Sequence, residues 1–321
     1  MEKTPLVSIG LPTFNRAHCI RTCLDSLITQ TYPHIELIIS DDGSTDETQA
    51  VCEEYAKKDS RIRYLRQPKN QGLIDNFYFV LKQAEGDYFG WAVDDDWFAP
   101  SYVEKHVEAL KHNPEYGAAG CSFQRWYGNG EVEEEMLLTG DRNMTHQSYY
   151  QVFAKVLQKK YRMQYMFHGI YRTKIIQGIL PHALPRTKGW DCILVSELAL
   201  ATHFYSIPDV LHYFGPRRRD ASDMNYFRST RDLESNKPRV RKTYFVGHTH
   251  THLIYECAMR ALTSPLVPFR RKLGIIIPIS VAIFSQRKKI FGFFYADPCR
   301  FFRKDYWREI KNELNRTKKK D

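Results

Sequence analysis

The chain has 321 residues, of which 43% are hydrophobic and 26% are charged, which is typical of globular proteins and excludes the disordered and fibrous classes. The seven cysteines are an odd number without a Cys-x-x-Cys pair, so neither a disulfide framework nor a cysteine zinc site is indicated, and a reduced, cytosolic protein is expected. The net charge of +10 lies entirely in residues 270–321, and this asymmetry predicts an acidic partner for the tail.

The N-terminal third alternates short apolar runs with amphipathic segments. The apolar runs are typical of buried strands, and apolar residues at three- and four-residue spacing between them are typical of helices. The expected strands cover residues 6–11, 35–39, 61–65 and 88–93, and the expected helices 17–30, 44–57, 73–84 and 100–110. Ser44 and Glu47 have capping-box spacing and are expected to open the second helix. This alternation predicts an α/β fold with a mainly parallel, Rossmann-like sheet and helices on both faces.

Polar clusters follow three of the expected strands, where ligands bind in parallel sheets. They are Thr13-Phe14-Asn15, Asp41-Asp42 and Asp94-Asp95-Asp96. Adjacent carboxylates repel one another, so the acidic triplet suits a hard cation such as Mg2+ or Mn2+ together with substrate phosphates. A phenylalanine ring offers a stacking face for a base, and an aspartate accepts the imide N–H of uracil. The alternatives are a solvated acidic turn, a core phenylalanine and a helix-capping aspartate.

Four motifs in order resemble those of the family 2 glycosyltransferases. They are VSIGLPTFNR (7–16), ELIISDDGSTDET (36–48), NQG (70–72) and EGDYFGWAVDDDWFAP (85–100). The resemblance is strong over residues 5–125, thinner to about 225 and absent beyond. It implies the GT-A fold and an inverting enzyme that uses nucleotide-sugar donors. On this basis we expect a nucleotide-sugar-binding half (1–125), an acceptor-binding and catalytic half (126–230) and a C-terminal helical extension (231–321).

The resemblance also implies roles for single residues. Phe14 would stack on the base, Asp42 would bind the uracil imide, and Asp94 would lie near the ribose. Mn2+ or Mg2+ would be bound by Asp95, and Asp96, in the last acidic position, is the second candidate for a metal ligand. Many members carry Asp-x-Asp-Asp here, whereas this chain has Val93 in the first place. The expected donor-binding residues are Pro12, Thr13, Phe14, Asn15, Arg16, Asp42, Asn70, Gly72, Asp94, Trp190, Arg217, Arg218 and Arg219.

Asp191 is the expected general base, because family members place a carboxylate at the start of a helix there. Trp190 replaces the usual glutamate, and its ring would suit a sugar platform. The alternative for Asp191 is an aspartate favoured by the helix dipole. Arg217, Arg218 and Arg219 match a loop that closes over the diphosphate, since guanidinium groups pair with phosphate oxygens. The histidines His248, His250 and His252 are weaker candidates, as helper ligands for the donor's metal.

The tail combines an apolar run over residues 273–285 with basic flanks and many aromatic residues. The run is too short to span a bilayer but suits a segment in the headgroup region. The alternative is a pair of amphipathic helices packed on the catalytic domain. The aliphatic run argues against nucleic acid as the partner. We therefore expect a cytoplasmic protein, peripheral on the cytoplasmic face of the cell membrane.

The sequence thus predicts a metal-dependent transferase that moves a sugar from a UDP-sugar to a glycan acceptor. A lipid-linked acceptor in surface polysaccharide synthesis would fit the tail. One alternative is a nucleotidyltransferase, although Pro12-Thr13-Phe14-Asn15-Arg16 lacks the glycine- and lysine-rich phosphate loop of such enzymes. Another is a membrane-docked sugar-nucleotide-binding homologue without activity.

Overall fold

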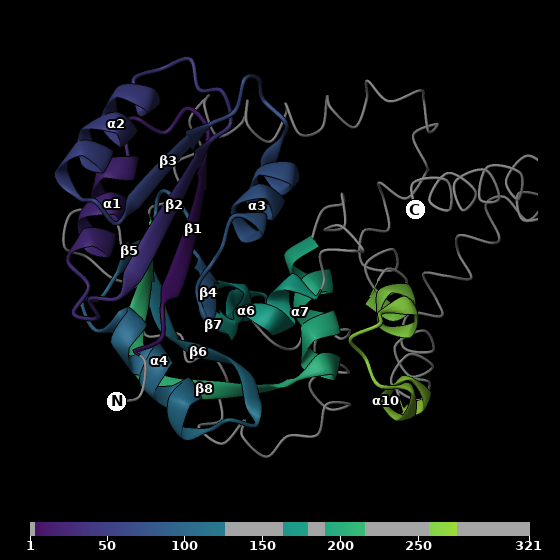
Figure 1. Cartoon of the computed structure of the whole chain (residues 1–321). Coiled ribbons are helices and arrows are strands. Elements are labelled where there is room, and N and C mark those ends of the chain that lie inside the picture. The colour runs from purple at the N-terminus through teal and green to yellow at the C-terminus, as the bar shows by residue number, and fades with distance from the viewer. Residues whose placement is uncertain (1–3, 126–162, 179–189, 216–256, 275–321) are drawn as a thin grey trace, which may run out of the picture.

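The computed structural model describes residues 4–125, 163–178, 190–215 and 257–274, which include one mixed β-sheet (Figure 1). Its strands are β1 (Val7–Thr13), β2 (Ile35–Asp41), β3 (Ile62–Arg66), β4 (Tyr88–Trp91), β5 (Trp97–Phe98), β6 (Tyr116–Arg125), β7 (Ile170–Arg172) and β8 (His203–Phe214). Within these residues the strand order is β3-β2-β1-β4-β7-β6-β8-β5. β3, β2, β1 and β4 are parallel, β7 is antiparallel to both neighbours, and β5 is antiparallel to β8.

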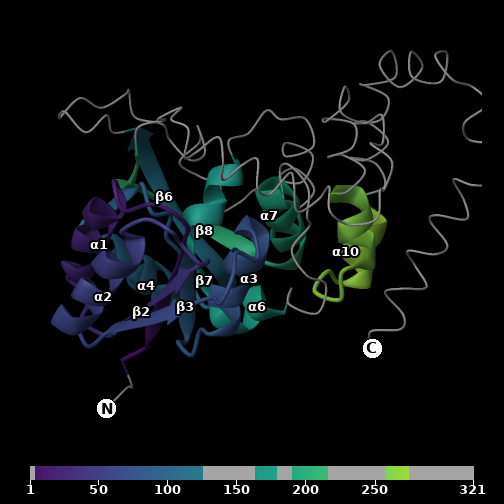
Figure 2. The same cartoon turned by 90° about the horizontal axis from the view of Figure 1, so that it is seen from above.

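Helices cover both faces of this sheet (Figures 1 and 2). The described helices are α1 (Ile20–Ile28), α2 (Thr48–Lys58), α3 (Leu73–Lys82), α4 (Tyr102–His112), the 3-10 helix η2 (Met163–His168), α6 (Thr173–Gln177), α7 (Trp190–Ala201), a helix over 257–263 and α10 (Phe269–Gly274). One apolar core contains buried side chains of α1, α2 and α4, and a second contains those of α3, α6 and α7. Among the described helices, none is both long and apolar enough to cross a bilayer.

The predicted α/β class with helices on both faces is confirmed, but the sheet is less parallel than expected. The expected strands and helices of the N-terminal third are present, with ends that differ by a few residues. β5 and β7 run against their neighbours, and apolar runs do not encode strand direction. Of the expected C-terminal helical extension, only residues 257–274 are described.

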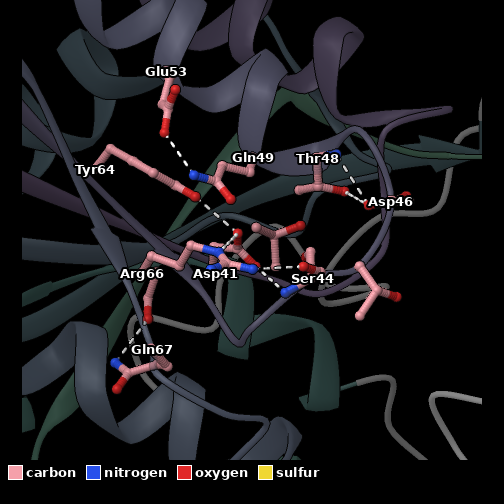
Figure 3. Close-up of polar contacts among 12 residues, drawn as sticks. Asp41, Ser44, Asp46, Thr48, Gln49, Glu53, Tyr64, Arg66 and Gln67 are labelled. Atoms are coloured by element: carbon pink, nitrogen blue, oxygen red, sulfur yellow. Dashed lines mark hydrogen bonds and ion pairs between the residues drawn. The ribbon is translucent and has the colours of Figure 1, made fainter.

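The predicted capping box at Ser44 is wrong. α2 begins at Thr48, and the Asp46 carboxylate accepts the Thr48 N–H at 3.0 Å (Figure 3). The Ser44 hydroxyl instead accepts the Asn15 N–H at 2.9 Å. Residues between β2 and α2 therefore form a loop that contacts the loop after β1.

The first strand, expected over residues 6–11, extends further, because β1 continues through Pro12 to Thr13, with Pro12 buried opposite Ser40 of β2. Nearby, α3 packs closely on β1. A Cβ atom at Gly10 would lie 2.7 Å from Val80 Cγ2, so a side chain there would push α3 away. This close packing brings the start of α3 beside the carboxyl ends of β1 and β2.

Candidate functional site

The carboxyl ends of β1, β2 and β4 meet at Thr13. Its carbonyl oxygen accepts the Asp42 N–H at 2.9 Å, and its hydroxyl donates to Asp94 Oδ2 at 2.8 Å. These contacts link the Asp41-Asp42 pair to the acidic triplet, although 81 positions separate Thr13 from Asp94 in the sequence. The three polar clusters predicted from the sequence therefore lie together.

Asp42 is held by the backbone at the start of α3. Its two carboxylate oxygens accept the N–H groups of Gln71 and Gly72, at 2.7 and 2.9 Å. Gly72 has a φ of 98°, in the region that favours glycine. Burial raises the pKa of Asp42 to about 6, and these two hydrogen bonds oppose the rise. The carboxylate is thus fixed in place, and each oxygen keeps a second lone pair for a ligand.

The neighbouring Asp41 has a different environment. Its carboxylate accepts the Tyr64 hydroxyl at 2.8 Å and the Ser44 N–H at 2.8 Å, and it forms an ion pair with Arg66 at 3.4 Å (Figure 3). Asp41 therefore supports the loop that follows β2. Of the two adjacent aspartates, Asp42 contacts the end of β1 and the start of α3.

The loop after β1 adopts a conformation that few residues accept. Asn15 has a φ of 56°, which asparagine tolerates better than most other residues. Its side-chain oxygen accepts the Thr45 N–H at 2.8 Å, which joins this loop to the loop after β2. Phe14 precedes it and is half-buried. Asn70, which precedes the two residues that bond to Asp42, has a buried Oδ1 that makes no hydrogen bond among the described residues.

Arg16, expected to contact the donor, is buried beside Asp94. Its Nε lies 3.3 Å from Asp94 Oδ1. Burial raises the pKa of Asp94, and the Arg16 guanidinium partly offsets that rise. Asp94 also accepts the Thr13 hydroxyl, so both of its oxygens have protein partners. Arg16 therefore balances the charge of Asp94 within the protein.

The other two carboxylates of the triplet have separate environments. Asp95 is half-buried, whereas Asp96 is 3% exposed. Asp96 Oδ2 lies 2.8 Å from His212 Nε2, and Asp96 Oδ1 accepts the Gly215 N–H at 3.2 Å. His168 Nδ1 lies 3.8 Å from the same Asp96 Oδ2. Together Asp96, His168 and His212 form a group with metal-ligand chemistry.

Sequence reasoning missed His168 and His212. Burial lowers the pKa of His212 to about 3 and holds that of His168 well below its usual range, so both imidazoles are neutral at pH 7. No motif of regular spacing connects these histidines with Asp96, because the three residues come from η2, from β8 and from the loop after β4. Only the folding of these elements brings them together.

Asp191 lies in the first turn of α7, as predicted. Burial raises its pKa, and hydrogen bonds from the backbone oppose the rise. Trp190 packs its ring 5.2 Å from Phe77 and 4.9 Å from Phe167, centroid to centroid, and Phe167 stacks on Trp91 at 4.7 Å. Since Trp91 is the last residue of β4, this aromatic cluster joins the start of α7 to the strand that precedes the acidic triplet.

The remaining predicted site residues lie outside the described residues. These are Arg217, Arg218 and Arg219 and the weaker candidates His248, His250 and His252. The preceding Gly215 is described and lies against the acidic triplet. A Cβ atom there would lie 1.8 Å from the backbone oxygen of Asp95, so only glycine permits this approach. The chain thus leaves β8 next to Asp95, with the three arginines following in sequence.

Comparisons with solved structures give the same fold. Residues 1–349 of S. aureus TarS, solved with UDP-GlcNAc, superpose with a TM-score of 0.61 at 17% identity, over 87% of this chain and 72% of that one. The mannosyltransferase PcManGT from Pyrobaculum calidifontis, solved with GDP-Man and Mn2+, gives a TM-score of 0.51 at 15% identity, over 99% and 87% of the two chains. The fold is therefore similar to that of these two solved structures.

Sequence comparison identifies the family. The glycosyltransferase EpsJ of Bacillus subtilis (strain 168) is 35% identical over 141 residues, which are 42% of this chain and 40% of EpsJ. This chain thus matches less than half of the length of that relative. The sequence also matches glycosyl transferase family 2 over residues 8–179, more than half of the chain. That match includes the three strand ends that meet at Thr13. The chain therefore belongs to glycosyl transferase family 2.

Proposed function

We propose that this chain is an inverting glycosyltransferase that uses a UDP-sugar and a divalent metal ion to glycosylate a glycan acceptor. The observation that carries the proposal is the Asp42 carboxylate, fixed by the N–H groups of Gln71 and Gly72 at the edge where β1 and β2 end. Uracil carries an imide N–H, and a fixed carboxylate with free lone pairs is a suitable acceptor for it.

The other residues near Asp42 suit a uridine nucleotide. Phe14 is half-buried in the loop after β1, where its ring would stack on the base. The buried Asn70 Oδ1 is a further acceptor. Asp94, tied to Thr13 and Arg16, is rigid enough to position a ribose hydroxyl. Asp42 follows β2, Phe14 follows β1 and Asp94 follows β4, and these strands are neighbours in the sheet, so one nucleotide could contact all three residues.

The acidic triplet suits the donor's metal ion. Asp95 is half-buried and lies in the same loop as Asp94, directly after the strand end at which Thr13 and Arg16 hold the Asp94 carboxylate. Carboxylate oxygens are the ligands that Mn2+ and Mg2+ take beside substrate phosphates, so the donor set fits either ion. When bound, such an ion would stabilise the negative charge that develops on the departing diphosphate. Arg217, Arg218 and Arg219 follow Gly215 in sequence and are our candidates for a second contact to the diphosphate.

Asp191 is our candidate for the group that takes the proton from the acceptor hydroxyl. Burial raises its pKa towards neutrality, as a general base requires. The aromatic contacts of Trp190 hold the first turn of α7 against η2 and so orient the carboxylate. Attack on the anomeric carbon from the side opposite the diphosphate would invert its configuration.

The C-terminal residues support a proposal for the acceptor and for the location of the protein. Phe269 and Leu273 of α10 are 73% and 53% exposed. Their neighbours Arg270, Arg271 and Lys272 open the basic region of residues 270–321. Exposed apolar side chains beside cations suit an anionic membrane surface. We therefore propose a peripheral protein on the cytoplasmic face of the membrane that acts on a lipid-linked glycan in surface polysaccharide synthesis.

Nucleotide binding provides the test of donor class. Calorimetry with UDP and CDP, each with Mn2+, should show at least about tenfold tighter binding of UDP, because cytosine has no imide N–H for Asp42. Asp42→Asn should remove this preference. Asp95→Ala should remove the metal-dependent part of UDP affinity and of donor hydrolysis. Equal binding of UDP and CDP by the wild type would overturn the uridine assignment, and hydrolysis unchanged in Asp95→Ala would overturn the metal assignment.

A further inference from the structure

Asp96, the last residue of the acidic triplet, forms a compact group with His168 and His212. The atoms that they offer all lie within 4.8 Å of one another. Asp96 Oδ2 is central, 2.8 Å from His212 Nε2 and 3.8 Å from His168 Nδ1. The three residues come from different parts of the fold, so an ion bound here would join the loop after β4 to η2 and β8.

The surroundings of this group are apolar and leave one nitrogen unsatisfied. Phe98 stacks on His212 at 4.8 Å, and Phe214 lies edge-on to His168 at 5.0 Å. His168 Nδ1 is buried and makes no hydrogen bond among the described residues. A buried nitrogen without a partner is destabilising by the free energy of its lost hydration. A cation between this nitrogen and the Asp96 carboxylate would remove that penalty.

The chemistry of the group indicates the class of ion. Two imidazoles and one carboxylate suit first-row transition metals, whereas Mg2+ prefers oxygen ligands. Metal–ligand bonds of about 2.0–2.2 Å place ligand atoms roughly 3–3.5 Å apart. Small shifts of the two rings from the present distances would reach that geometry. We propose that Asp96, His168 and His212 bind a divalent transition-metal ion of the Zn2+ class.

This site would be separate from that of the donor's metal. Asp96 and His212 are 3% and 2% exposed and the His168 side chain is 15% exposed, whereas Asp95 is half-buried, so we expect a diphosphate to meet an ion at Asp95 rather than one bound among these three residues. Asp96 also accepts the Gly215 N–H, at the end of β8 next to Asp95. The ion would therefore stabilise the loop of the acidic triplet by joining it to η2 and β8. This role does not depend on the transfer reaction.

Metal titration of the full-length protein tests the proposal, with Co2+ as a spectroscopic probe and Zn2+ as its competitor. We expect one equivalent of Co2+ to give the visible absorption of a four- or five-coordinate site, and Zn2+ to displace it. His168→Phe should weaken Co2+ binding at least about 100-fold. Without metal this variant should be no less stable than the wild type, because it removes the unsatisfied nitrogen.

Three control variants separate this site from other ligands in the chain. Asp95→Asn should retain the Co2+ spectrum while losing metal-dependent UDP binding, which distinguishes this proposal from the proposed function. His106→Phe makes the same change at another buried imidazole, whose Nε2 also lacks a partner among the described residues, and it should retain the spectrum. Replacement of His248, His250 and His252 by alanine should also retain it.

Two results would overturn the proposal. One is a Co2+ affinity that is unchanged in His168→Phe or lost in Asp95→Asn. The other comes from X-ray absorption of the Zn2+-loaded wild-type protein, which needs no variant and so remains decisive if His168→Phe fails to fold. Two imidazole ligands are expected in that spectrum, and a shell of oxygen atoms alone would exclude the site.

Discussion

The Thr13 hydroxyl donates a hydrogen bond of 2.8 Å to Asp94 Oδ2, which joins the end of β1 to the acidic triplet. Thr13→Val keeps the shape of the side chain but leaves this oxygen of a buried carboxylate without its donor. We expect a loss of about 1–3 kcal/mol in the free energy of unfolding, measured by urea denaturation, and weaker UDP binding. Thr29→Val removes an exposed hydroxyl that bonds only to backbone oxygens of the preceding helix turn, such as that of Asp25. This control should change neither the free energy of unfolding nor UDP binding appreciably. Equal effects of the two variants would contradict a special role for Thr13.

Asp42 should make the protein less stable as the pH rises. Burial raises its pKa from 3.8 to about 6 in the folded state, so the folded protein binds more protons than the unfolded chain between these values. Its stabilising contribution is complete below pH 3.8 and is lost as the pH rises through 6. The difference in unfolding free energy between the wild type and Asp42→Asn should fall by about 2 kcal/mol from pH 4 to pH 7.

Asp59 provides the control of opposite sign for that measurement. Its hydrogen bond with Arg61 lowers the pKa of Asp59, so its stabilising contribution is present above the unfolded-state pKa and is lost at low pH. The difference between the wild type and Asp59→Asn should therefore grow as the pH rises. Slopes of the same sign for Asp42→Asn and Asp59→Asn would show that burial does not control the titration of Asp42.

Asp191→Asn should separate donor binding from sugar transfer. We expect an unchanged affinity for UDP and a fall in kcat of about 10²–10⁴-fold, because the amide cannot accept the acceptor's proton. Since burial raises the pKa of Asp191, the wild-type rate should fall as the pH drops through that raised value. Asp209→Asn, at an exposed aspartate paired with Lys105, should leave kcat unchanged. Near wild-type transfer by Asp191→Asn would rule Asp191 out as the base.

The buried ion pair between Glu197 and Arg260 should hold the 257–263 helix on α7. Arg260 Nε lies 2.5 Å from Glu197 Oε2, and Glu197 is fully buried. Glu197→Gln should lower the free energy of unfolding by about 3–5 kcal/mol, because it removes the carboxylate charge from a buried ion pair. The matched change Glu54→Gln breaks the exposed pair with Arg21 and should have a much smaller effect. Similar losses in urea denaturation would contradict this role of the buried pair.

Membrane binding should depend on the exposed apolar residues of α10. Phe269→Glu combined with Leu273→Glu should reduce flotation with anionic liposomes, because it removes apolar contact and adds negative charge. Ala50→Glu combined with Ser60→Glu adds the same charge at exposed positions in and after α2 and serves as the control. If both double variants float like the wild type, α10 does not contribute to docking.

Much of the candidate site could be predicted from the sequence, because most of its residues stand at or just after the ends of strands that are recognisable as apolar runs. Thr13, Asp42 and Asp94 each come directly after an apolar run or at its end, and parallel strands bring their carboxyl ends to one edge. The place of Asp191 in the first turn of α7 was predicted from the resemblance to the family rather than from a local pattern. The Ser44 capping box failed, because Asn15 competes for the Ser44 hydroxyl from a loop 29 residues away.

The sequence alone thus determined the α/β class, the N-terminal helices and strands and the polar strand ends, since these depend on local patterns of apolar and polar residues. Only the tertiary structure decided which of the adjacent carboxylates has which partner. Asp41 bonds Tyr64, Asp42 bonds the start of α3, and Asp96 lies against His212 and His168. Adjacent side chains point in different directions. The atoms that they contact belong to segments far away in the sequence, and no local sequence pattern shows which of these segments will lie next to them.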